Sequence, residues 1–285
     1  MKRLLLVWRT VYRASVHFHR DRCYDRATVI AYFGLLSFLP LAVLLVTLGA
    51  LALGTDAAEK STELFLQNVL YGLPPQVMIQ VKSMQQQIWS GVGYLVLVFW
   101  TASKVFSKIE TGLDQVFRVD KRRPFALRKV LAFALVGILS VLLVASVVVE
   151  GLLSTIDRFI DATALAPLKE LPLYQNVDSF VSRYIVPWSL TVLAFFSVYW
   201  LIPARSIPWR VALIGGSVAG SLWTALKVGF TYYISHMATY TRTYGALATV
   251  VVFLLWINLS ACLLLWGAEL AAVAGGFREE KSSSG

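Results

Sequence analysis

Four charged residues interrupt or directly follow long charge-free runs of the sequence: Lys104, Glu150, Lys227 and Glu269. A charge inside a lipid bilayer is costly and usually has a partner or a functional role. If the runs cross a membrane, Lys227 lies roughly 25 Å along its helix, at the depth of Glu150. Lys104 or Lys108 then lies near the depth of Glu269. These residues are candidates for a polar intramembrane site that contacts an anionic ligand. The alternative is that the lysine side chains extend to the lipid headgroups.

Signatures of an enzyme are missing from the sequence. It contains no G-x-x-x-x-G-K-[ST], G-x-G-x-x-G, H-E-x-x-H or G-x-S-x-G pattern. His17, His19 and Cys23 form a loose cluster, but residues two apart on a helix point in different directions, which disfavours a metal site. We therefore expect no catalytic residue, no bound metal and no cofactor.

The elements that would position these residues are apolar helices. Of the 285 residues, 58% are hydrophobic and only 15% are charged, whereas a soluble domain carries about 25% charged residues. Six segments are long enough for a helix that crosses about 30 Å of hydrocarbon. The sequence therefore predicts an all-α membrane domain over residues 1–275, followed by a disordered cytoplasmic tail at 276–285. The six predicted transmembrane helices are about 29–53, 89–111, 129–153, 184–204, 209–235 and 244–273.

The excess of 26 Lys and Arg over 16 Asp and Glu predicts the orientation of these helices. With both termini in the cytoplasm, the inside segments 1–26, 104–129, 205–210 and 276–285 hold 7, 8, 2 and 2 Lys and Arg residues, 19 together. The outside segments hold 6, and Lys227 is the remaining one. Because positive residues accumulate in cytoplasmic connections, the sequence predicts that both termini are inside. The charge excess then needs no nucleic-acid partner.

Short amphipathic helices are predicted outside the apolar runs. In the N-terminal segment, basic residues such as Arg9 and Arg13 share one helical face and Trp8 lies on the other, as in a helix that lies in the headgroup layer. A solvated leader is the alternative. Two further amphipathic segments, 56–88 and 154–183, are predicted at the outer membrane surface.

Small residues and a proline predict how the helices pack. Gly216 and Gly220 recur with Ala212 at every fourth position, and a second small face runs from Ser217 to Gly229. Such faces allow two helices to approach closely. Pro40 predicts a kink in its helix, because it frees the carbonyl of Leu36, and Ser37 is placed to help re-satisfy the backbone. Gly245 is a further candidate kink or packing position.

Four stretches resemble the YihY/BrkB family of bacterial inner-membrane proteins. They are ATVIAYFGLLSFLPL (27–41), FWTASKVFSKIETGLDQVFRV (99–119), SVYWLIPARSIPWR (197–210) and YGALATVVVFLLWINLSACLLLWGAELAA (244–272). The similarity covers about residues 20–275 and is weakest in the two outer segments. The resemblance implies a six-helix, multi-pass protein of the cytoplasmic membrane, and its final motif includes Glu269. Members have been labelled as a tRNA-processing ribonuclease or associated with serum resistance and with lipid or lipopolysaccharide export.

Two functions are consistent with these patterns. The first is transport or handling of a lipid or an anionic solute, with membrane lipids, above all anionic ones, as partners. The alternative is a non-catalytic scaffold or partner subunit, whose small-residue faces bind a second copy or another membrane protein. A ribonuclease is disfavoured, because the acidic residues do not cluster in any loop as a metal-dependent nuclease requires.

Overall fold

The computed structural model confirms the all-α prediction for the part of the chain that it describes. It describes residues 2–53, 92–119, 123–124, 126–132, 134–135, 137–138, 141–142, 155, 184–236 and 238–277, and their regular secondary structure is helical throughout. Glu150, the outer segment 56–88, nearly all of 154–183 and most of the predicted helix 129–153 lie outside these residues. The predictions made for them stay predictions.

Six helices have defined bounds. They are α1 (Lys2–Arg20), α2 (Cys23–Leu53), α5 (Val92–Val116), α8 (Val186–Leu201), α9 (Trp209–His236) and α10 (Ala238–Ala274). Proline marks two of the starts: α8 has a proline in its first turn, and α9 begins directly after Pro208, which has no N–H to continue a helix backwards.

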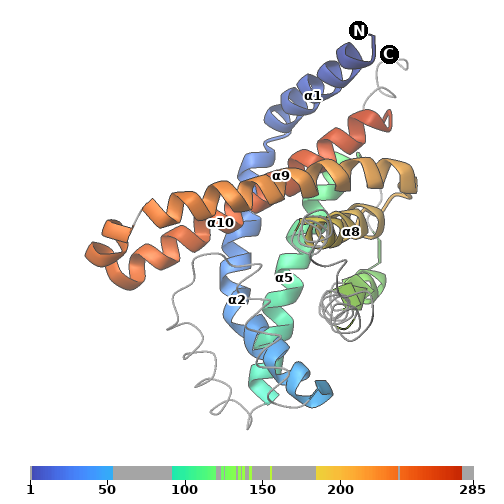
Figure 1. Ribbon diagram of the computed structural model, residues 1–285. Coiled ribbons are helices and arrows are strands. Elements are labelled where there is room, and N and C mark those ends of the chain that lie inside the picture. Colours follow the sequence, from blue (N-terminus) through green and yellow to red (C-terminus); the bar gives the residue numbers. More distant parts are fainter. Residues whose placement is uncertain are drawn as a thin grey trace, which may run out of the picture.

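The helices form two groups that are joined by α10. α2 packs against α5, while α9 packs against both α8 and α10, and α10 also contacts α2. Figure 1 shows α9 and α10 side by side, crossing α2 and α5. α1 lies along the C-terminal end of α10, so the beginning of the chain and the end of its last helix are neighbours (Figure 1).

Two helices in the described part are long and apolar enough to cross a membrane. They are Trp209–Ile234 in α9 and Val250–Ala274 in α10, with mean hydropathies of 1.4 and 2.2. Only 28% of each stretch is buried within the protein, whereas the core helix of a soluble protein would be mostly buried. Apolar side chains such as Val228 and Val251 are exposed on the outer surface of these helices.

The hydrophobic core lies where α2 begins and where α5 and α10 end. Small and aromatic side chains interlock there: Phe117 and Tyr199 are fully buried among alanines. α10 ends in a turn in which Gly276 has a φ of 74° and the Phe277 N–H donates to the Ala272 carbonyl over 3.0 Å. This is the usual glycine C-cap. Gly276 and Phe277 form this turn, and the rest of the predicted tail, 278–285, lies outside the described residues.

Glycines on α9 lie where other helices come close. A Cβ on Gly216 would stand 2.8 Å from the Phe196 N atom of α8. A Cβ on Gly220 would stand 3.0 Å from the Val192 side chain of the same helix. The second predicted face differs: a Cβ on Gly229 would meet nothing within 4 Å. Another close approach of α9 is made by Gly215, one position away from the predicted face, where a Cβ would stand 2.7 Å from Ala271 of α10.

The backbone around Pro40 remains helical, because α2 continues to Leu53. Ser37 is buried, and its hydroxyl donates to the Phe33 carbonyl over 2.6 Å and to Gly34 over 3.3 Å. Ser37 thus bonds to backbone carbonyls of the preceding turn and not to the carbonyl of Leu36. A serine side chain on a helix reaches back three or four residues rather than one.

Candidate functional site

A polar stripe on α5 forms the centre of the candidate site. Ser103, Ser107, Glu110 and Asp114 are spaced by four, three and four residues, which places them on one face of the helix. The two acidic side chains are buried, Glu110 to 2% exposure and Asp114 to 8%. Burial of a carboxylate is unfavourable unless it is paired or hydrogen-bonded, so the structure must supply partners.

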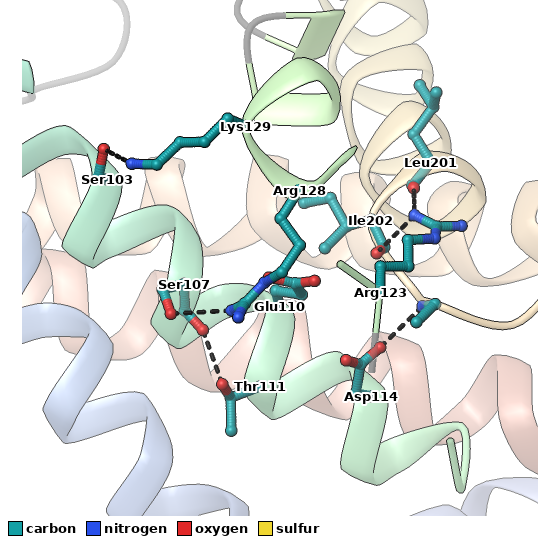
Figure 2. A network of polar contacts seen from close by, with 11 residues as sticks. Ser103, Ser107, Glu110, Thr111, Asp114, Arg123, Arg128, Lys129, Leu201 and Ile202 are labelled. Atoms are coloured by element: carbon teal, nitrogen blue, oxygen red, sulfur yellow. Dashed lines mark hydrogen bonds and ion pairs between the residues drawn. The ribbon is translucent and has the colours of Figure 1, made fainter. Parts of the chain in front are cut away.

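The helical residues 126–132 supply partners for the first part of the stripe. Arg128 Nε donates to Glu110 Oε2 over 2.6 Å, and its guanidinium also donates to Ser107 Oγ over 3.1 Å. Lys129 Nζ donates to Ser103 Oγ one turn away. Figure 2 shows these side chains lying side by side between the two helical segments. The connection that follows α5 is thereby folded back onto it.

The connection between α8 and α9 supplies the partner for the second acid. Asp114 Oδ1 accepts a hydrogen bond from the Ala204 backbone N–H over 2.8 Å. On the same side, Arg123 donates to the Leu201 carbonyl over 3.0 Å and to Ile202 over 3.4 Å (Figure 2). Carbonyls at a helix C-terminus lack helical partners and carry partial negative charge, so a guanidinium is well suited to them. α5 therefore holds the end of α8 in place.

A second buried acid comes from α10. Glu269 is fully buried, and its Oε1 accepts from Cys23 Sγ over 3.6 Å at the start of α2. Burial, reinforced by the charge of Glu269, raises the pKa of Cys23 to about 12. The thiol is therefore neutral at physiological pH and acts as a hydrogen-bond donor rather than as a nucleophile.

The turn between α1 and α2 is tied to the end of α5 by a further pair. Arg118 and Asp21 approach to 3.5 Å, and Gln115 Nε2 donates to the Asp21 carbonyl over 3.3 Å. Arg22 and Arg118 have φ angles of 52° and 54°, the left-handed conformation that often follows a helix C-terminus. The turn after α1 and the turn after α5 are thus held against each other.

This polar cluster can hold helix ends in fixed positions. Its acids are bonded to a guanidinium, to a backbone N–H and to a thiol. Such bonds suit neither a nucleophile with its general base nor a metal site. Among the described residues, no group of three His, Cys, Asp or Glu side chains is placed to hold a metal ion. The contacts of Glu110 with Arg128 and of Asp114 with Ala204 join α5 to residues 126–132 and to the end of α8. The contact of Glu269 with Cys23 joins α10 to the start of α2. We call these three contacts together the latch.

The predicted site residues that the structure describes do not form one cluster. Lys104 is exposed, with Nζ 5.5 Å from the Trp100 ring centroid. Lys227 is half-buried on α9. Because Gly267 meets Ala219, Glu269 lies roughly 12–15 Å from Lys227 along α9. The proposed pairing of Lys227 with Glu150 falls outside the described residues.

Sequence reasoning missed most of the latch. Glu110 lies at the end of the predicted helix 89–111, and Asp114 and Arg128 lie in the segment counted as cytoplasmic, but none of the three is among the predicted site residues. The spacing of the polar stripe was the available signal, because four polar residues on one face of a helix that begins as an apolar run predict a buried polar contact. No sequence pattern indicates the contact of Cys23 with Glu269, because 246 positions separate the two residues.

Comparison with known proteins places the chain among bacterial membrane proteins. The profile of the family described as virulence factor BrkB matches residues 14–284. A UPF0761 membrane protein of Alkalilimnicola ehrlichii is 26% identical over 88% of the chain, and one of Nitrosospira multiformis is 28% identical over 92%. The chain spans only 55% and 60% of the lengths of these two relatives. It spans 83% of a third, from Pseudoalteromonas translucida, to which it is 25% identical over 88% of its own length. No solved structure matches the chain.

Proposed function

Because the chain belongs to the virulence factor BrkB family of membrane proteins, we propose that it is a multi-pass protein of the bacterial inner membrane, with six transmembrane helices and both termini in the cytoplasm. The alternation of Lys- and Arg-rich connections supports this orientation. The contact of α1 with the end of α10, where Trp266 Nε1 donates to Ser15 Oγ over 3.2 Å, suits a chain whose two ends share one side.

Reporter fusions test this topology. Green fluorescent protein fused after residue 277 should fluoresce, because it folds in the cytoplasm. Alkaline phosphatase inserted within 56–82 should be active, because it folds outside. An active phosphatase fused after residue 277 would refute the proposed orientation.

Within the membrane, the protein transports or handles a lipid or an anionic solute of the envelope. The observation that carries this proposal is Lys227, a half-buried cation in a helix that is otherwise apolar enough to cross a membrane. It lies roughly 25 Å from the start of α9. An ammonium group at such a position is stabilised by a polar cavity, by an acid such as the predicted partner Glu150, or by an anionic ligand. A phosphate-bearing lipid headgroup has the matching charge.

The experiment compares Lys227→Met with Lys227→Arg and with the control Val228→Met on the exposed, lipid-facing side of α9. Each variant is purified in several mild detergents, and bound phospholipid is measured by native mass spectrometry. Lys227→Met should lose bound anionic lipid and fail to complement a deletion strain, whereas the other two should retain both. A well-folded Lys227→Met protein with unchanged lipid and full complementation would refute the proposal.

The alternative of a non-catalytic scaffold or partner subunit draws on the second small-residue face of α9. α8 already packs against Gly216 and Gly220. By contrast, Ala225 is exposed, and a Cβ on Gly229 would meet nothing within 4 Å. A second helix would fit there. Gly229→Leu should then break an oligomer seen on size-exclusion chromatography in detergent, and a variant that elutes unchanged would argue against this surface.

Ribonuclease activity is not proposed. The buried acids Glu110, Asp114 and Glu269 are bonded to Arg128, to a backbone N–H and to Cys23. A metal-dependent nuclease needs carboxylates that converge on shared metal ions. These contacts do not favour such chemistry.

A further inference from the structure

Helices α8, α9 and α10 pack so closely that they form one unit. A Cβ on Gly216 of α9 would stand 2.8 Å from a backbone atom of α8, and a Cβ on Gly215 would stand 3.1 Å from the Gly267 carbonyl oxygen of α10. Helices that meet backbone to backbone leave little side chain between them that could adjust to a relative movement. We call these three helices together the α8–α10 unit.

Helices α2 and α5 meet this unit through flexible side chains. A Cβ on Gly34 of α2 would stand 3.1 Å from the side chain of Ile257, and a Cβ on Gly112 of α5 would stand 3.0 Å from that of Leu265. Residues 126–132 are hydrogen-bonded to α5, and we call α2, α5 and this segment the α2–α5 unit. Because side chains can change rotamer, helices that meet through them can slide or turn against each other by small amounts.

A polar bridge joins the two units where α5 ends and α9 begins. Asp114 accepts a hydrogen bond from the Ala204 N–H over 2.8 Å, and Arg123 donates to the Leu201 carbonyl over 3.0 Å (Figure 2). Arg123 and Ala204 are only half-buried, and the Leu201 carbonyl belongs to the last turn of α8, where carbonyls have no helical partner. Water can therefore replace these bonds without unfolding a helix.

Away from the bridge the two units diverge. In Figure 1, α2 and α5 extend downwards, whereas the hairpin of α9 and α10 extends to the left. Lys227 lies on this hairpin, roughly 25 Å from the start of α9. The bridge therefore joins the units at an end of the protein that is distant from Lys227.

We propose that the bridge is a gate on the cytoplasmic side of the protein, and that it is closed in this structure. It opens when the α8–α10 unit turns relative to the α2–α5 unit, by the hinge or shear movement that packed helices perform. In transporters, one bundle of helices rocks against another in this way around a substrate site. The gate rests on the proposed transport function and orientation for what passes and which side opens, whereas the movement itself is measured without them.

The distance between the units is measured with spin labels on Leu127→Cys and Leu213→Cys, because both residues are exposed and helical. The full chain, with its two native cysteines changed to serine, is studied in nanodiscs by double electron–electron resonance. Asp114→Ala with Arg123→Ala should raise the ratio of a longer distance to the original one about tenfold or more for each charged hydrogen bond lost. Arg123→Ala alone changes a half-buried side chain and should give a smaller shift toward the same longer distance.

A second measurement identifies the side that opens. Ile202 is 2% exposed beside the bridge, so Ile202→Cys should react slowly with a membrane-impermeant maleimide. In inside-out vesicles the reaction should accelerate in the double variant by the same factor as the open population rises. The control is Arg9→Ala with Asp25→Ala, which removes an exposed base and an exposed acid outside the bridge and should leave both readouts unchanged.

Three results would overturn the gate. The first is a double variant that is folded by circular dichroism but shows the original distance and the original labelling rate. The second is equal opening in the control variant. The third is labelling that accelerates only in right-side-out vesicles. Lys227→Met leaves the bridge intact and should change neither readout, so its effect on bound lipid decides the proposed function separately.

Discussion

The buried ion pair of Glu110 and Arg128 can be tested by removing one partner at a time. The side chains are 3% and 22% exposed, and the two atoms in contact are 2.6 Å apart. At this burial, loss of Arg128 leaves a carboxylate that water cannot reach. Arg128→Gln should therefore lower the free energy of unfolding by about 3–5 kcal/mol. Glu110→Gln leaves a neutral amide beside a partly exposed guanidinium and should cost about 1–3 kcal/mol.

The double variant measures the interaction itself. With both charges gone, neither is left buried alone, so the loss should be smaller than the sum of the single losses by about 0.5–3 kcal/mol. Unfolding is followed by circular dichroism during titration of the detergent-solubilised protein with sodium dodecyl sulfate. The matched control is Lys104→Gln, an exposed charge on the same helix, which should change the free energy by less than about 0.5 kcal/mol.

Two results would refute this reasoning. If Arg128→Gln costs no more than Lys104→Gln, then Glu110 is hydrated and the latch is open in detergent. If the single losses add fully in the double variant, then the two residues act independently and their contact does not stabilise the fold.

Two further predictions concern packing and the buried thiol. Gly267→Ala would place a Cβ 2.6 Å from Ala219 and should lower the unfolding free energy by about 1–3 kcal/mol, whereas Gly229→Ala meets open space and should be neutral or slightly stabilising in the same titration. With a pKa of about 12 for Cys23 against 9.0 for an ordinary cysteine, alkylation of the folded Cys262→Ala protein by iodoacetamide at pH 8 should be about a thousandfold slower than after unfolding. The stabilisation linked to this raised pKa is present below pH 9 and is lost as the pH rises toward 12, so alkaline unfolding in that window checks its sign. Equal alkylation rates in the two states would contradict the burial of Cys23.

The sequence by itself determined where helices form and which family the chain belongs to. α9 and α10 follow from long apolar runs, that of α9 interrupted only by Lys227, because an apolar segment in lipid must satisfy its backbone polar groups internally and a helix does so with local bonds. The start of α9 at Trp209 follows from Pro208 in the same local way. The family motif around Glu269 likewise needed no knowledge of neighbours in space.

Only the tertiary structure decided which charges are buried and what they meet. The small residues of α9 were predicted as packing positions, but contacts with distant segments determine that Gly216 meets α8 and that Gly215 meets α10. Glu110 and Glu269 lie close to the charged connections and would be solvated on isolated helices. They are buried because residues 126–132 and the start of α2 fold over them. The free energy of a buried charge depends on partners that come from elsewhere in the chain, and local sequence does not encode where they lie.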